Sequence, residues 1–410
     1  MSTKAKKTKK NSIINTFLAN GSMDIPFLAI LMTIVTIGLV MLFSASYTYS
    51  YYNRGDSTQI FVRQLIFAVI GIVLMFVISR IRYEYFKLVA LVGVVVSIAL
   101  LLLVLVLPEY KPGFKRWINL GFTTFQPSEI AKIGLIMILA YLLDKNYKGV
   151  TGKIPSEMPG IRNIPELTNG KYVIYKSFTS VICYGLIILV FAGLVYLEHH
   201  VSGTILMLLI GVVMLWLGEV RGRWFTVGVI IGVVAVVLLI ANPDILAKYA
   251  GERITAWLDK DFDPLGARWQ TNNSLYAIGS GGLLGTGLGQ SKQKHLYVSE
   301  PQNDLIFSIV CEELGLIGAI IILLIFALLV WRGITLSLRA KDKFGKLLGI
   351  GLTAQIGLQV ILNILVITDW MPNTGISLPF FSYGGSSLIM LLAQMGLVLS
   401  ISRTANIEKQ

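Results

Sequence analysis

The sequence predicts an all-α polytopic membrane protein with about ten transmembrane helices, and three observations favour this fold class. Of the 410 residues, 55% are hydrophobic and only 14% are charged, whereas soluble proteins carry about 25% charged residues. The apolar residues gather into runs of roughly 20, the length that a helix needs to cross a bilayer. The mean hydropathy of +0.73 also excludes one large soluble domain.

The predicted helices follow one another along the whole chain. Their ranges are 25–46, 60–79, 86–107, 127–143, 175–196, 202–218, 224–241, 305–331, 347–367 and 385–402. The fourth and sixth are short for a span, and Pro127 suits the first position of a helix. The longest interval without a span, about 242–304, is predicted to form a long loop between the seventh and eighth helices.

Lysine and arginine predict the orientation of the chain. The divisions are a basic tail over 1–22, a membrane domain over 23–404 and a short tail over 405–410. A cytoplasmic N-terminus leaves most of the 35 lysines and arginines on the cytoplasmic side, as the positive-inside rule requires. An even number of spans then makes both termini cytoplasmic and the loop over 242–304 extracytoplasmic. The basic tail suits an anionic inner leaflet, and because aromatic residues do not interleave its lysines, we expect no nucleic-acid binding.

Some cations oppose this bias and form two groups on the outer side. The first group surrounds the third loop, and the second lies in the long loop: Lys111, Lys115, Arg116 and Lys132, then Arg253, Lys260, Arg268, Lys292 and Lys294. An anionic ligand presented from the outer leaflet would explain them; ordinary solvated loop charge is the alternative. Lys115 and Arg116 together could neutralise a diphosphate. Glu129 and Lys132, three residues apart on a helix, share one face.

Asp304, where the long loop meets the eighth helix, is the candidate general base. A carboxylate at the rim of a span can meet a lipid-linked substrate and still exchange protons. The alternative is a helix N-cap, provided by Asn303 or Asp304. Glu312 and Glu313 follow roughly 12 Å deeper along the axis of the eighth helix. They would either fix helix packing or line a polar cavity.

Further polar residues complete the candidate substrate site. Gln270 and Asn273 lie in the long loop with Arg268, and Ser382, Tyr383 and Ser386 lie between the last two helices. These last three could bind a sugar or cap the final helix. The glycine-rich run over 279–290 matches no nucleotide-binding pattern and predicts tight turns at the membrane surface. Glu198, His199 and His200 are expected to form a polar rim and no zinc site, because adjacent histidines do not share a helix face.

Several stretches together resemble the shape, elongation, division and sporulation (SEDS) family of membrane glycosyltransferases. They read KRWINLGFTTFQPSEIAK, SGTI, ARWQTNNSLYAIGSGGLLGTGLGQ, SEPQNDLIFSIVCEELGLIG and TGISLPFFSYGGSS, and they occur in this order over about Lys115 to Arg403. The PFFSYGGSS form looks more like the division and sporulation members than the elongation member. The chain departs from the usual family sequence at two places. Gln302 and Asn303 stand before the aspartate, and the run HHVSGT lacks the acidic residue that relatives often have just before the SGT-like turn.

The resemblance implies a peptidoglycan polymerase that acts on lipid II, an undecaprenyl-diphosphate-linked disaccharide-peptide, with Asp304 as the catalytic residue. It also implies a class B penicillin-binding protein transpeptidase as partner, among other divisome membrane proteins. The chemistry agrees: one base must accept the hydroxyl proton, and cations can replace an acid at the diphosphate, whereas a glycosidase needs two carboxylates. No cofactor is required, although a divalent cation, magnesium or manganese, could help; the sequence has no dedicated metal ligands.

Two other functions are compatible with a polar helical bundle. One is a flippase or other transporter of a lipid-linked precursor, and the other is a non-catalytic scaffold that recruits a transpeptidase. Polymer formation from lipid II in detergent separates the first from the enzyme, because transport has no meaning without a bilayer. The gathering of the candidate residues at one membrane face favours the enzyme.

Overall fold

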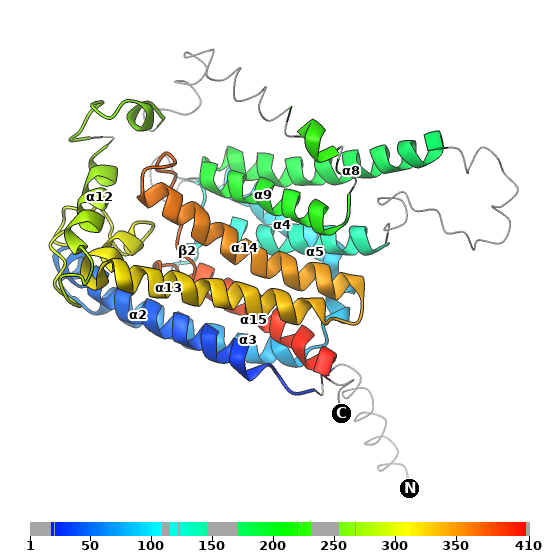
Figure 1. Cartoon of the computed structure of the whole chain (residues 1–410), viewed down its shortest axis with the longest axis horizontal. Helices are drawn as coiled ribbons and strands as arrows, with labels where there is room; N and C mark the ends of the chain where they lie inside the picture. Colours follow the sequence, from blue (N-terminus) through cyan, green and yellow to red (C-terminus); the bar gives the residue numbers. More distant parts are fainter. Residues whose placement is uncertain are drawn as a thin grey trace, which may run out of the picture.

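Helices make up most of the chain in the computed structural model. The part that the structure describes comprises residues 18–19, 21–108, 115–121, 124–145, 170–220, 222, 224–228, 230, 254–266 and 268–406. The long helices are α2 (Ile25–Arg54), α3 (Gln59–Arg80), α4 (Glu84–Val106), α5 (Pro127–Lys145), α8 (Gly170–Leu197), α9 (Val201–Leu217), α13 (Ile306–Leu338), α14 (Lys343–Ile367) and α15 (Gly385–Asn406). They run side by side along the molecule, and the shorter α12 (Trp269–Gly281) lies at one end (Figure 1).

The predicted all-α fold is confirmed. Each predicted span has a helix at its position, except that the seventh, 224–241, lies largely outside the described residues; those described over 224–228 are helical. Six described helices are long and apolar enough to cross a membrane, and the apolar stretches Val181–Leu197 and Val201–Leu217 are shorter. The long loop is more structured than predicted, because it contains α12.

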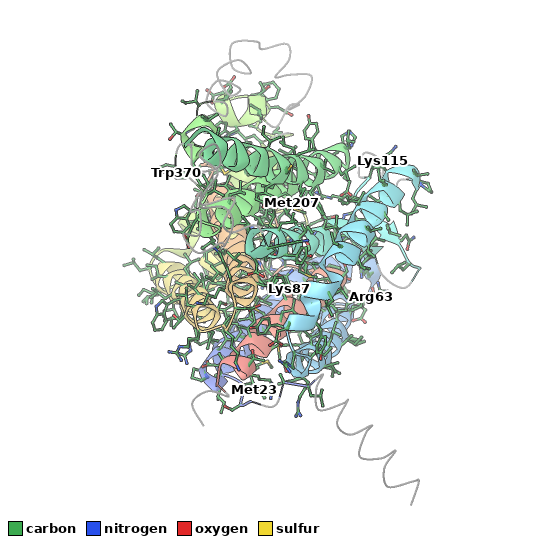
Figure 2. The ribbon with its side chains drawn as sticks, turned by 90° about the vertical axis from the view of Figure 1, so that its right-hand side faces the viewer. Met23, Arg63, Lys87, Lys115, Met207 and Trp370 are labelled. Carbon is green, nitrogen blue, oxygen red and sulfur yellow. The ribbon has the colours of Figure 1, made fainter. Side chains whose placement is uncertain are left out.

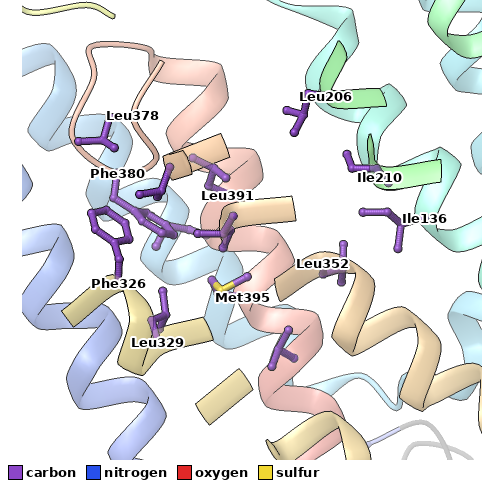
Figure 3. Packing of buried hydrophobic residues seen from close by; sticks show 14 of the residues in the cluster. Ile136, Leu206, Ile210, Phe326, Leu329, Leu352, Leu378, Phe380, Leu391 and Met395 are labelled. Atoms are coloured by element: carbon purple, nitrogen blue, oxygen red, sulfur yellow. The ribbon is translucent and has the colours of Figure 1, made fainter. Parts of the chain in front are cut away.

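The connection between α14 and α15, residues 368–384, enters the interior of the bundle. Phe380 and Phe381 are 3% and 1% exposed, and the ring of Phe381 lies 5.7 Å from that of Phe326, well inside α13. Figure 3 shows Phe380 and Leu378 of this connection above the packed side chains of α13 and α15. The apolar core therefore includes irregular chain as well as helices.

Gly315 breaks α13, and the glycine-rich loop after α12 completes the hydrogen bonding of the broken helix. Gly315 has φ 67° and ψ −174°, outside the helical region. The carbonyl groups of Glu312 and Glu313 accept from the amides of Thr286 and Gly287 at 2.9 and 3.0 Å. In return, the amides of Leu316 and Ile317 donate to Gly282 and Leu283 at 2.9 and 3.2 Å. This exchange satisfies polar main-chain groups that lipid could not.

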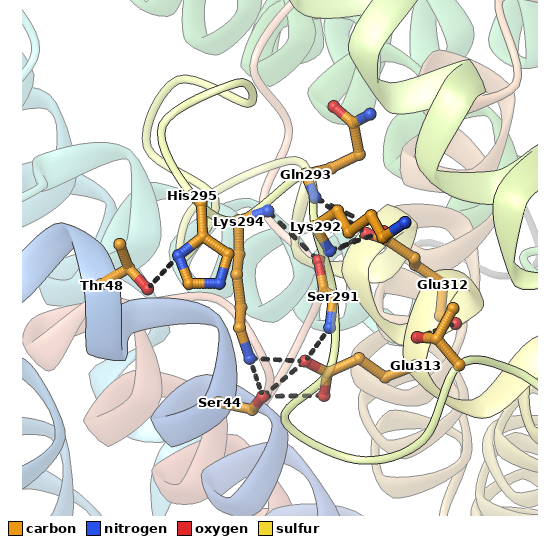
Figure 4. A network of polar contacts seen from close by, with 10 residues as sticks. Ser44, Thr48, Ser291, Lys292, Gln293, Lys294, His295, Glu312 and Glu313 are labelled. Carbon is orange, nitrogen blue, oxygen red and sulfur yellow. Dashed lines mark hydrogen bonds and ion pairs between the residues drawn. The ribbon is translucent and has the colours of Figure 1, made fainter.

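The side chains of Glu312 and Glu313 hold the segment that follows these turns (Figure 4). The Nζ of Lys294 lies 2.9 Å from Oε1 of Glu313 and 3.1 Å from Oγ of Ser44 on α2, and both members of the ion pair are buried. The carboxylate of Glu312 accepts from the Lys292 amide at 2.8 Å. Neither glutamate is among the described residues that line the cavity discussed below. The packing interpretation of these two residues is therefore favoured.

At the opposite end of the bundle, the chain around residues 21–24 is bound to α13 and α15. Arg332 on α13 forms an ion pair of 2.6 Å with Asp24, which also caps α2 by accepting from the amide of Phe27. Arg403 on α15 donates to the carbonyl of Gly21 at 3.0 Å. These contacts fix α2, α13 and α15 relative to one another.

Gly281→Ala is expected to destabilise the fold by about 1–3 kcal/mol, the usual cost of overpacking. A Cβ at Gly281 would overlap the carbonyl oxygen of Cys311, on the segment of α13 that the loop completes. Gly279→Ala in the same helix is the matched control, because nothing lies within 4 Å of its added Cβ. Thermal unfolding in detergent compares the two variants, and equal midpoints would contradict the close packing of α12 against α13.

Candidate active site

A cavity of about 620 Å³ lies at the end of the bundle where α14 joins α15. Its walls come from α2, α3, the hairpin of β1 (Ile118–Asn119) and β2 (Thr124–Phe125), α5, α9, α14 and α15, with the segments over 299–304 and 373–385. The cavity therefore gathers the polar stretches that the sequence analysis singled out, the first and last of which are more than two hundred residues apart.

Asp304 lines the cavity immediately before α13. Its Oδ2 lies 3.2 Å from the point that a Cβ on Gly375 would occupy, and Nη1 of Arg116 lies 3.9 Å from the same point. Gly375 has φ +70°, which favours glycine, and its missing side chain leaves room beside both groups. The structure thus brings together the predicted base and a predicted cation.

The N-cap alternative for Asp304 is not supported by the helix geometry. The N-cap position of α13 is Leu305, and no side chain caps the helix there. The Nδ2 of Asn303 donates instead to the carboxylate of Glu300 at 2.7 Å. Neither Asn303 nor Asp304 therefore occupies the N-cap position of α13.

Lys132 and Glu129 lie together on the first turns of α5, as their spacing predicted. The Nζ of Lys132 is 2.9 Å from Oε2 of Glu129 and 3.4 Å from Oε1 of Gln359, and both charged residues are buried and line the cavity. The carboxylate beside Lys132 is that of Glu129 on the same helix, whereas Arg116 lies near Asp304, which comes from a different segment. The two cations consequently offer different environments to an anion.

Two more of the predicted substrate-binding residues line the cavity, and each also has a structural contact. The Oε1 of Gln270 accepts from Nδ2 of Asn373 at 3.0 Å. The Oγ of Ser382 donates to the carbonyl of Asn303 at 2.8 Å and accepts from the amide of Leu378 at 2.7 Å. Ser382 thereby holds the connection over 368–384 against the chain beside Asp304.

Four predicted substrate-binding residues are outside the described lining of the cavity: Lys115, Arg268, Asn273 and Ser386. Arg268 is buried, with Nη2 2.6 Å from Oδ2 of Asp369 and a further hydrogen bond to the carbonyl of Ala256. Asn273 donates within its own helix to the carbonyl of Trp269 at 2.8 Å. The ion pair gives Arg268 a role in docking the long loop on the chain that follows α14, whereas the hydrogen bond of Asn273 stays within α12.

Two further cations that were not predicted as site residues line the cavity. Arg54 at the end of α2 and Arg63 on α3 both line it. Figure 2 shows Arg63 and Lys115 on one flank of the bundle and Trp370 on the opposite flank. The available signal was the position of Arg54 and Arg63 around the first loop, on the side predicted to face outward.

Glu198 and His200 occupy the turn between α8 and α9, and the charge of Arg116 acts on both. His200 lines the cavity, and its Nδ1 lies 3.3 Å from Nε2 of Gln126. Burial, together with the cations Arg116 and Lys132, holds the pKa of His200 well below its usual value, so the ring is neutral. Burial raises the pKa of Glu198 to about 8, and Arg116 offsets part of this effect. The described residues contain no group of three metal-ligating side chains, here or elsewhere.

Glu198→Gln is expected to reduce the pH dependence of stability. Because the folded pKa of Glu198 lies above its ordinary value of 4.5, its neutral form contributes stability that is complete below about pH 4.5 and is lost as the pH rises to about 8. Glutamine cannot ionise and lacks this loss. Thermal unfolding between about pH 5 and 9 should show the variant gaining on the wild type as pH rises, and a constant difference would contradict a neutral Glu198.

Comparison with known proteins agrees with this architecture over nearly the whole chain. The family model described as "Cell cycle protein", which covers FtsW, RodA and SpoVE, matches residues 25–407. Stage V sporulation protein E of Bacillus subtilis is 37% identical over 384 residues, which are 93% of this chain and 97% of that protein. A probable peptidoglycan glycosyltransferase FtsW of Trichlorobacter lovleyi is 32% identical over 381 residues, covering 92% and 93%.

Solved structures lead to the same family. A chain from a structure titled "Structural coordination of polymerization and crosslinking by a peptidoglycan synthase complex" has a TM-score of 0.72 and 26% identity, and the match covers 94% of this chain and 98% of that one. The rod shape determining protein RodA of Thermus thermophilus has a TM-score of 0.62 and 26% identity, covering 93% and 97%. The expected resemblance is confirmed, and this chain belongs to the FtsW/RodA/SpoVE family of cell cycle proteins.

Proposed function

We propose that this chain is a peptidoglycan glycosyltransferase that polymerises lipid II into glycan strands during cell division or sporulation. The observation that carries the proposal is the placement of the Asp304 carboxylate and the Arg116 guanidinium around Gly375 in one cavity. The relatives named peptidoglycan glycosyltransferase FtsW, at 32–34% identity over most of the chain, support the activity.

The reaction requires a base and a means of stabilising the leaving group. A hydroxyl of the acceptor sugar attacks the anomeric carbon of the donor, the bond to the diphosphate breaks, and Asp304 accepts the hydroxyl proton. The diphosphate leaves as an anion, so Arg116 and Lys132 stabilise it without donating a proton. Arg116 suits this role because its planar guanidinium can contact two phosphate oxygens at once.

The positive charge that this chemistry needs is available from side chains of the cavity. The cations Arg54, Arg63, Arg116 and Lys132 line the same cavity as Asp304. We therefore assign charge stabilisation to these side chains. The neutral amides of Gln270 and Asn373, joined at 3.0 Å, offer hydrogen bonds to sugar or peptide groups.

The position of the cavity favours an enzyme over the two alternative functions. Asp304 precedes α13 and Gly375 follows α14, so the reactive groups lie at one end of the bundle, whereas a transporter needs a site that opens to both sides. A scaffold would not need a polar cavity lined by four cations and by the carboxylates of Asp304, Glu129 and Glu300. Lys132 and Glu129, which pair with each other in the wall of this cavity, are buried ionisable residues of the kind that often mark substrate sites in membrane proteins.

The proposal includes an orientation and a partner. Both termini are cytoplasmic, and the cavity faces the outer side of the cytoplasmic membrane, where the precursor is displayed; labelling of a cysteine near Lys292 but not near Lys343 from outside would agree with it. The partner is a class B penicillin-binding protein, since strands must be crosslinked, together with other divisome membrane proteins. The match to a chain of a peptidoglycan synthase complex supports this, and co-purification tests it.

Asp304→Asn is expected to abolish polymer formation from lipid II while leaving a folded, membrane-inserted protein that binds the substrate. Loss of a general base costs about 10²–10⁴-fold in rate, and asparagine preserves the size of the side chain. Gel analysis of glycan products from purified protein in detergent measures the loss. A near-native rate would move the base elsewhere, with Glu300, which also lines the cavity, as the first candidate.

Arg116→Ala is expected to weaken the use of lipid II by at least about tenfold in kcat/KM, because a charge-assisted contact to phosphate contributes about 1.5–3 kcal/mol. Lys343→Ala is the matched control: Lys343 begins α14 at the opposite end of the bundle, 3.9 Å from Glu219. Equal effects of the two changes on lipid II polymerisation would show that Arg116 is ordinary loop charge.

A further inference from the structure

Asn363 is a buried amide at the point where two irregular segments meet. It lies on α14, four residues before the end of the helix, and its side chain is 0% exposed. Its Nδ2 donates to the main-chain carbonyl of Asp304 at 2.7 Å and to that of Ile376 at 2.8 Å. One side chain therefore joins the segment before α13 to the connection between α14 and α15.

The orientation of this amide follows from its partners. Carbonyl oxygens only accept hydrogen bonds, so the nitrogen of Asn363, with its two hydrogens, must face both of them. The opposite orientation would place three oxygens together. Each hydrogen of Nδ2 has one carbonyl partner. Because Asn363 and Ile376 are both buried, water cannot replace the bond between them at no cost.

The two carbonyls belong to two chain segments that meet at Gly375 in the wall of the cavity. Ile376 directly follows Gly375, and the Asp304 carboxylate lies against Gly375. One turn earlier on α14, Nε2 of Gln359 donates to the carbonyl of Ser377 at 3.0 Å, and its Oε1 faces Nζ of Lys132. The same face of α14 thus sets the positions of a carboxylate and a cation.

We propose that Asn363 is a positioning residue for glycosyl transfer: by joining the main chain of Asp304 to that of Ile376, it holds the Asp304 carboxylate beside Arg116. This inference rests on the proposed function, in which Asp304 is the base. Asn363 itself does not touch the reacting atoms. Its contribution is the geometry of the base, and a displacement of about 1 Å in such a group can cost about 10²-fold in rate.

Gln355 provides a matched control on the same helix. It lies two turns further from the cavity on the same face of α14, and it is also 0% exposed. Neither its Oε1 nor its Nε2 has a hydrogen-bond partner among the described residues. Replacing Gln355 therefore removes a buried amide of α14 without releasing Asp304.

The test compares Asn363→Leu with Gln355→Leu in the purified full-length protein with lipid II as substrate. We expect Asn363→Leu to lower kcat about 10²-fold with KM within about twofold of the wild type, because the base is displaced while substrate contacts remain. We expect Gln355→Leu to keep kcat within about twofold. Native kcat in Asn363→Leu, or equal losses in both variants, would overturn the proposal.

Two additions keep the test decisive. If Asn363→Leu does not fold, Asn363→Ser retains one donor and is expected to fold with a kcat between those of the wild type and an inactive variant. A wild-type kcat in Asn363→Ser overturns the proposal.

Hydrogen–deuterium exchange over 300–306 and 374–380 should be faster in Asn363→Leu than in Gln355→Leu, and equal exchange also overturns the proposal. Absence of polymer from the wild type would contradict the proposed function, whereas the exchange comparison would still decide the role of Asn363.

Discussion

Main-chain polar groups that no helix pairs must find partners within the protein when they lie inside a bilayer, and the cavity of this protein depends on how that requirement is met. At Gly315, the broken α13 and the glycine-rich loop satisfy each other. In the connection over 368–384, side chains from two helices, α14 and α3, and one side chain of the connection itself take the role of a hydrogen-bonded neighbour: Asn363, Gln359, Gln64 and Ser382. Irregular chain can therefore enter the bundle and stay fixed there.

A fixed main chain is what the proposed chemistry needs from the fold. Glycosyl transfer from a diphosphate has a good leaving group, so its difficulty lies in placing a hydroxyl, a base and a compensating positive charge in one arrangement. Asp304 and Arg116 come from segments that have no regular structure of their own, and both border Gly375. Their relative position is consequently set by the contacts of the connection over 368–384, to which α14 contributes through Asn363 and Gln359.

The sequence predicted the helices and part of the site, for reasons that differ between residues. Apolar runs of spanning length locate helices reliably, and Asp304, Arg116 and Lys132 were noticeable because a charge at a membrane rim opposes the surrounding composition. Arg268 resembled them in sequence but pairs with Asp369, about a hundred residues away, which only the fold can reveal. Asn363 was overlooked because a single amide within an apolar helix has no local signal of the carbonyls that it will meet.

The position of bound substrate tests the central claim most directly. A structure of the Asp304→Asn variant with lipid II should place the diphosphate against Arg116 in the cavity. A sugar hydroxyl should lie about 3 Å from the side chain of residue 304, or the anomeric carbon of a neighbouring molecule should lie close to that side chain. Density for the diphosphate on another surface, or sugars held away from residue 304 with the diphosphate still beside Arg116, would contradict the account.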